Sequence, residues 1–159
     1  MIKNSSLLGC GDNYDERSAG GIVYKLDGKK ILWLIIYTIS KNQTKGIYKL
    51  PKGHLKKDEF LKDAALREVE EEGKIKAEIV FKLGSNDYLI WNKETRIKIV
   101  KKVTFFLMKY VNESRLRYYD GETVIAQEWV EFKEAKEKLA FDSEKKLLEK
   151  AIKEVNKFI

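Results

Sequence analysis

A single acidic helix between two groups of strand-like segments constrains the fold of this chain most strongly. Residues 58–72 have the apolar spacing of an amphipathic helix, with Asp58 as the predicted N-cap and Gly73 as the predicted stop. Apolar patterning predicts strands at 18–24, 31–39 and 47–50 before this helix and at 75–83, 86–91, 97–110 and 128–132 after it. Two more helices are predicted at 133–139 and 143–158. This order predicts an α/β fold with a mixed sheet packed between helices.

The chain has the length of one domain, since its 159 residues are too few for two ordinary ones. Residues 1–15 are polar and predicted to form a loose arm, and residues 16–159 to form the domain. The longest apolar run, residues 31–39, is far shorter than the ~20 residues of a membrane-spanning helix. The only cysteine, Cys10, cannot form an internal disulfide. With no signal sequence in view, we expect a cytoplasmic protein without a membrane partner.

The net charge of +7 suits a polyanionic ligand such as nucleotide phosphate or nucleic acid. The lysines are spread along the chain rather than clustered, which favours a solvated, lysine-rich surface instead. No segment matches a nucleic-acid-binding module. Nucleic acid is therefore expected as a partner only in the form of an RNA 5′ end.

Three glutamates of the predicted helix share one face. At ~100° per residue, Glu68, Glu71 and Glu72 fall within a single arc, with Arg67 beside them. Like charges this close repel, and a divalent cation such as Mg²⁺, which prefers oxygen ligands and bridges to phosphates, would offset the repulsion. The alternative is a solvated acidic face paired with lysines, which is common in glutamate-rich helices.

The segment before the helix favours the metal-binding interpretation. Residues 50–54 (Leu-Pro-Lys-Gly-His) form a turn that places backbone and Lys52 near the amino end of the helix, where anions are favoured. Residues 53–75 resemble the Nudix box, Gly-x5-Glu-x7-Arg-Glu-(apolar)-x-Glu-Glu-x-Gly-(apolar). Every defined position agrees except the last glycine, where this chain has Lys74 and carries Gly73 one place earlier. The chain is thereby identified as a member of the Nudix hydrolase superfamily.

This resemblance implies a fold and a set of roles. The fold would be an α/β/α sandwich with a mixed sheet, and the cofactor Mg²⁺, with Mn²⁺ as an alternative. The metal ligands would be Glu68, Glu71, Glu72 and the carbonyl of Gly53. Glu68 would also act as base toward the attacking water, and Arg67 would orient the glutamates by ion pairing. Glu59 would be structural or an outer metal contact.

Segments outside the box resemble bacterial and archaeal diadenosine tetraphosphate hydrolases, notably residues 17–23, 50–55, 106–110 and 132–135. This narrower resemblance implies that Lys52 contacts phosphate and that Tyr88 stacks on a base, although a half-buried strand tyrosine is an equal alternative for Tyr88. His54 is a further candidate phosphate contact, with a turn-capping role as the alternative. A further family carboxylate would fall at Thr123, so Glu122 and Glu128 are the two candidates to replace it.

The sequence therefore predicts a Mg²⁺-dependent pyrophosphohydrolase acting on a nucleoside diphosphate-linked substrate. The preferred substrate is diadenosine tetraphosphate, cut asymmetrically to ATP and AMP. The first alternative is hydrolysis of nucleoside triphosphates or of RNA 5′ ends. A nucleotide-sensing module without catalysis is the second, although such modules typically lose box carboxylates that this chain retains.

Overall fold

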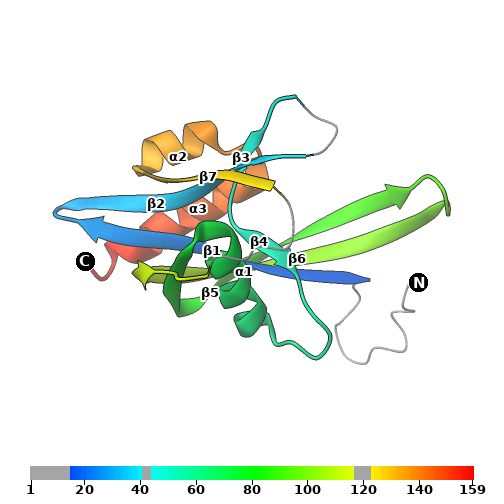
Figure 1. Cartoon of the computed structure of the whole chain (residues 1–159), viewed down its shortest axis with the longest axis horizontal. Coiled ribbons are helices and arrows are strands. Elements are labelled where there is room, and N and C mark those ends of the chain that lie inside the picture. Colours follow the sequence, from blue (N-terminus) through cyan, green and yellow to red (C-terminus); the bar gives the residue numbers. More distant parts are fainter. Residues whose placement is uncertain (1–14, 41–43, 117–122) are drawn as a thin grey trace.

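The computed structural model describes residues 15–40, 44–116 and 123–159. Figure 1 shows the arrangement of the elements, whose bounds are β1 (Glu16–Asp27), β2 (Lys30–Ile39), β3 (Ile47–Lys49), β4 (Lys52–His54), α1 (Leu61–Gly73), β5 (Ile75–Asn92), β6 (Ile97–Glu113), β7 (Thr123–Val130), α2 (Phe132–Lys138) and α3 (Asp142–Asn156). Of the amino-terminal segment predicted as an arm, residues 1–15, residues 1–14 lie outside the described residues.

One mixed sheet holds the strands together. Its main path runs β3-β2-β1-β6-β5, while β4 pairs with β1 and β7 pairs with β2. The pairing of β1 with β6 is parallel, and the β1–β2, β1–β4, β2–β7 and β5–β6 pairings are antiparallel. β1 therefore lies at the centre of the sheet and brings β4, just before α1, next to the core.

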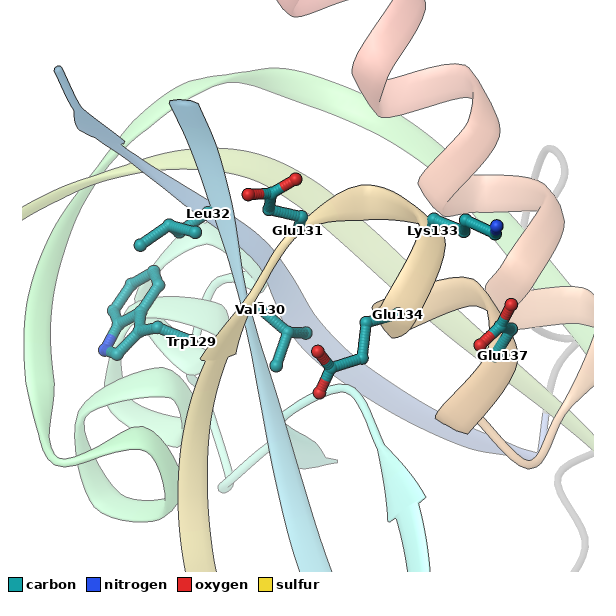
Figure 2. A pocket seen from close by; sticks show the side chains of 7 residues that line it. All are labelled: Leu32, Trp129, Val130, Glu131, Lys133, Glu134 and Glu137. Atoms are coloured by element: carbon teal, nitrogen blue, oxygen red, sulfur yellow. The ribbon is translucent and has the colours of Figure 1, made fainter. Parts of the chain in front are cut away.

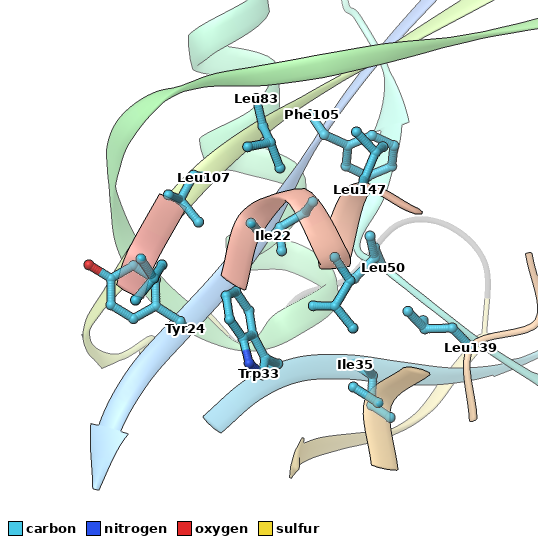
Figure 3. Close-up of a cluster of buried hydrophobic side chains, with 14 of the residues drawn as sticks. Ile22, Tyr24, Trp33, Ile35, Leu50, Leu83, Phe105, Leu107, Leu139 and Leu147 are labelled. Atoms are coloured by element: carbon cyan, nitrogen blue, oxygen red, sulfur yellow. The ribbon is translucent and has the colours of Figure 1, made fainter. Parts of the chain in front are cut away.

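The two faces of the sheet bury separate apolar clusters, because successive strand residues point to opposite sides. On β2, Leu34 packs in the cluster that includes Ala64, Ala65 and Val69 of α1. Its neighbours Trp33 and Ile35 pack on the other face with α3, whose buried side chains include Leu148. Figure 3 shows this second cluster around α3, with Trp33 and Leu50 among its labelled residues. Helices thus cover both faces, which confirms the predicted α/β/α sandwich.

The start of α1 differs from the prediction. Asp58 is not the N-cap, because it takes a left-handed conformation (φ 63°) in a turn where the Glu59 amide donates to the Lys56 carbonyl (3.1 Å). The N-cap is Phe60. The helix includes Gly73, and Lys74 caps its carboxyl end in the left-handed region (φ 59°). A lysine therefore makes the turn that the box assigns to glycine.

Three strand predictions were also wrong in their bounds. The predicted strands 75–83 and 86–91 form one strand, β5, because pairing with β6 continues through register shifts such as the one between Lys82 and Gly84. β7 ends at Val130, since Phe132 already begins α2. The distal part of the β5–β6 hairpin projects from the body of the molecule (Figure 1). Across the described ranges, no helix is long and apolar enough to cross a membrane.

Candidate active site

The turn between β3 and β4 brings Lys52 and Gly53 against the centre of the molecule. β4 pairs with β1, so that Gly53 lies opposite Ala19 and Lys52 opposite Gly20. The Gly21 amide donates to the Pro51 carbonyl (3.1 Å). A β-carbon on Gly20 would overlap that carbonyl, so the close approach of β1 to the turn requires glycine there.

Gly53 lies directly against Glu68. A β-carbon at Gly53 would overlap the Glu68 carboxylate, so only glycine leaves room for this carboxylate beside the β4 backbone. The Gly53 backbone and a box glutamate, predicted as joint metal ligands, are thus brought together.

Arg67 connects the acidic residues of the site. Its guanidinium donates two hydrogen bonds to Glu59, from Nε to Oε2 (2.8 Å) and from Nη2 to Oε1 (2.9 Å). Nη1 donates to Glu68 Oε1 (2.8 Å) and to Glu71 Oε2 (3.3 Å). Nη2 also donates to the carbonyl of His54 (3.0 Å). One arginine therefore orients three carboxylates and ties α1 to the end of β4, which is the geometry that the predicted orienting role requires.

The same contacts shift the ionisation of the carboxylates. Hydrogen bonds from Arg67 lower the pKa of Glu59 to about 2, with the Lys56 amide, which donates to Glu59 Oε1 (2.9 Å), adding to the effect. Burial raises the pKa of Glu68, and its hydrogen bond from Arg67 opposes the shift. Glu59 is therefore a fixed anion, whereas Glu68 is the more basic carboxylate of the two.

Glu72 faces the turn rather than Arg67. It is only 4% exposed, and its Oε1 accepts a hydrogen bond from the Lys52 amide (2.8 Å). Its carbonyl accepts one from Gln127 of β7 (3.0 Å). Glu70 points away from this group and accepts a hydrogen bond from the Ser114 hydroxyl (2.6 Å).

The donor set fits a divalent cation. Glu68 and Glu71 share one Arg67 nitrogen, and the Gly53 backbone packs on Glu68. Carboxylates and a carbonyl are the oxygen ligands that Mg²⁺ prefers. In the part of the chain that the structure describes, no three acidic, histidine or cysteine side chains lie together in a way that could hold a metal ion. The ligand set of Glu68, Glu71, Glu72 and Gly53 stays a prediction, and Arg67 holds two of its carboxylates, Glu68 and Glu71.

Lys52 extends to the other face of the sheet. Its ammonium lies 3.4 Å from Oε2 of Glu144 on α3, 5.6 Å from the ring centre of Tyr88 and 5.5 Å from that of Phe141. The Tyr88 hydroxyl is 3.2 Å from the Ser143 hydroxyl. Lys52 and Tyr88, predicted separately as substrate contacts, are thus neighbours.

The remaining candidates lie away from this group. The His54 ring is exposed, with Nε2 3.4 Å from Glu16. Glu128 accepts hydrogen bonds from Tyr48 (2.6 Å) and Lys138 (2.9 Å), which lower its pKa. Its carboxylate therefore pairs away from the α1 glutamates, whereas its neighbour Gln127 points toward α1 and donates to the Glu72 carbonyl. Glu122 lies outside the described residues.

Sequence reasoning missed Glu144, which is fully buried. It has the same helical spacing as Leu147, Leu148 and Ala151, all buried on α3. A charged residue on an apolar stripe is a signal that could have identified it.

The molecule also has open hollows outside this site. Figure 2 shows one of about 530 Å³, lined by Leu32, Trp129, Val130, Glu131, Lys133, Glu134 and Glu137. None of these is a predicted site residue, and the lining carries three carboxylates and one lysine. An acidic hollow is a poor match for a polyphosphate, so we do not assign the substrate to it.

Sequence comparison with known proteins places the chain in one family. A family model described as NUDIX domain matches residues 15–151. The MutT4 protein of Mycobacterium tuberculosis (strain CDC 1551 / Oshkosh) is 30% identical over 146 residues, which is 89% of this chain. The match spans only 56% of that relative's length.

Solved structures share the fold at low sequence identity. A NUDIX hydrolase from Nitrosomonas europaea superposes with a TM-score of 0.68 at 18% identity, covering 87% of this chain and 89% of the other. An Ap4A hydrolase from C. elegans, in a binary complex, superposes with a TM-score of 0.61 at 20% identity, covering 90% of this chain and 99% of the other.

Proposed function

The chain belongs to the NUDIX domain family, and from that membership we propose that it is a pyrophosphohydrolase that cuts diadenosine tetraphosphate asymmetrically to ATP and AMP. The observation that carries the catalytic part of the proposal is the Arg67 centre. One guanidinium orients Glu59, Glu68 and Glu71 beside Gly53. The substrate part rests on the resemblance of the flanking segments to diadenosine tetraphosphate hydrolases.

Glu68 is the residue that we propose as general base. It is largely buried and held by Arg67, and burial raises its pKa, which makes it a better proton acceptor at neutral pH. A water oxygen attacks phosphorus, the bridging P–O bond breaks, and the water proton passes to Glu68. The departing nucleotide phosphate leaves with the bond's electron pair. When bound, Mg²⁺ would supply positive charge that stabilises the phosphate oxygens during this step.

Two residues are proposed to hold the substrate. Lys52 would bind phosphate with its ammonium, and Tyr88 would stack on one base, for which aromatic contacts are worth ~1–3 kcal/mol per base. Their closeness supports one continuous binding surface, since the Lys52 ammonium lies 5.6 Å from the Tyr88 ring centre. A nucleobase of the substrate held at one end determines which phosphorus the water attacks. The substrate is therefore cleaved at one position, into two unequal products.

The products test this proposal directly. We expect chromatography to show equal amounts of ATP and AMP from diadenosine tetraphosphate with Mg²⁺, and ¹⁸O from labelled water on one defined product. Two ADP molecules as main products would reject the asymmetric cut.

A second candidate is hydrolysis of single nucleoside triphosphates. The 30% identity to MutT4, a protein named as a mutator, favours it. Faster turnover of a nucleoside triphosphate than of diadenosine tetraphosphate would select this candidate, and faster turnover of triphosphorylated RNA would select an RNA 5′-end substrate.

A further inference from the structure

Glu144 of α3 is a buried carboxylate that the proposed chemistry does not use. It has no exposed surface, yet it begins the buried stripe of α3 that continues through Leu147, Leu148 and Ala151. A leucine there would extend that stripe. Replacing buried ion pairs by well-packed apolar residues is often neutral or stabilising, so fold stability alone does not explain a negative charge at this position.

Both oxygens of Glu144 face the turn that precedes α1. Oε1 accepts a hydrogen bond from the Leu50 amide (2.9 Å). Oε2 lies 3.4 Å from the Lys52 ammonium. A single carboxylate therefore contacts the residues on both sides of Pro51, one through its backbone and the other through its side chain.

The backbone of Lys52 is held from the opposite face of the sheet. Its amide donates to Glu72 Oε1 (2.8 Å), and Glu72 belongs to α1. Lys52 is thus held at its backbone amide by Glu72 of α1 and at its ammonium by Glu144 of α3. The aromatic rings of Tyr88 and Phe141 flank the ammonium at 5.6 and 5.5 Å, within the range of a cation–π contact.

We propose that Glu144 is a positioning residue that holds the Lys52 ammonium ready for substrate phosphate; the proposal rests on the phosphate-binding role of Lys52 given above. A lysine side chain has four flexible methylene groups and loses rotamer freedom when it binds an anion. An ammonium already fixed by Glu144 avoids much of that loss at the moment of binding. Glu144 acts on the substrate only through Lys52 and does not contact it.

The test is a double-mutant cycle between Glu144 and Lys52. Glu144→Gln keeps the shape of the side chain and an acceptor for the Leu50 amide but removes the charge that faces Lys52. We expect it to raise the KM for the best substrate, and the Kd for inorganic pyrophosphate with Mg²⁺ by calorimetry, by about tenfold. The value of kcat should change much less. In a Lys52→Met background, Glu144→Gln should have no further effect.

Matched controls separate positioning from general damage. Glu149→Gln removes a half-exposed carboxylate of the same helix, paired with Lys136 at 2.7 Å, and should change neither constant. If Glu144→Gln does not fold, Glu144→Asp is used instead, because its carboxylate is one methylene group farther from Lys52. It should also raise the KM and the pyrophosphate Kd with little change in kcat.

The two proposals fail in different ways. The proposed function alone is rejected if the wild-type protein hydrolyses no nucleotide but still binds pyrophosphate in a way that depends on Lys52 and Glu144. A wild-type Kd retained in Glu144→Gln, no pyrophosphate binding by the wild type, or an equal loss in the Lys52→Met background overturns the positioning role.

Discussion

Glu59 offers the most quantitative test of the Arg67 centre. Glu59→Gln keeps the size of the side chain but removes the charge that accepts two hydrogen bonds from Arg67 (2.8 and 2.9 Å) and one from the Lys56 amide (2.9 Å). An amide has one acceptor oxygen, so its NH₂ group would face a donor. The variant should therefore fold with a weakened link between α1 and the turn before it.

The magnitude follows from the pKa of Glu59, which the contacts lower from 4.5 to about 2. At about 1.36 kcal/mol per pH unit, the full shift corresponds to about 3 kcal/mol. The side chains of Glu59 and Arg67 remain 15% and 20% exposed, and since solvent screens the pair, we expect a loss of about 1 to 2 kcal/mol. Because the folded-state pKa is the lower one, this stability is complete above the unfolded value of 4.5 and is lost as the pH falls toward 2.

Urea unfolding in EDTA, at several pH values between 3.5 and 7, measures this difference without a bound metal. The gap between wild type and Glu59→Gln should be largest at pH 7 and shrink to about half near pH 3.5. Glu134→Gln, at an exposed pair with Lys138 (2.9 Å), serves as control and should change stability little at any pH. A gap that stays constant with pH, or no gap at pH 7, would refute the reasoning.

Three further substitutions test other parts of the account. Gly53→Ala forces a methyl group into the Glu68 carboxylate, so calorimetry should show weakened Mg²⁺ binding and thermal unfolding a loss of about 1–3 kcal/mol; unchanged values would contradict the close contact. Lys74→Gly relieves a left-handed lysine (φ 59°) and should raise stability by up to about 1 kcal/mol in urea unfolding; a lower stability would show that Lys74 is not strained. Lys52→Ala should raise the KM for diadenosine tetraphosphate and leave the Kd for Mg²⁺ unchanged. If Lys52→Ala and wild type have the same KM at both low and high salt, Lys52 does not bind phosphate.

The parts of the fold that depend on local pattern were predictable from the sequence. The apolar stripe of α1 and the apolar run of β2 identify buried elements, and Leu34 and Trp33 lie in opposite clusters because successive strand residues point to opposite faces. Element ends were less predictable. The turn at Asp58 and the continuity of β5 both depend on backbone hydrogen bonds to other segments, which no local pattern contains.

In the candidate site, too, contacts between residues close in sequence were predictable and contacts between distant segments were not. The glutamates of α1 and Arg67 are close in sequence, so helical spacing alone places them together. The contact of Leu50 with Glu144 joins residues 94 positions apart, and only the packing of α3 on the sheet creates it. The position of Glu128 was not predictable either: its carboxylate pairs with Tyr48 and Lys138, while its neighbour Gln127, on the opposite face of β7, reaches α1.

The central claim is that the α1 glutamates form a metal-dependent hydrolytic site, and the turnover of Glu68→Gln with and without Mg²⁺ tests it most directly. We expect wild-type protein to release nucleotide products from diadenosine tetraphosphate only when Mg²⁺ is present. Glu68→Gln should remain folded and lose about 10²–10⁴-fold in kcat, because the proposed general base is gone. Wild-type turnover that persists in EDTA, or a Glu68→Gln variant as fast as wild type with Mg²⁺, would contradict the account.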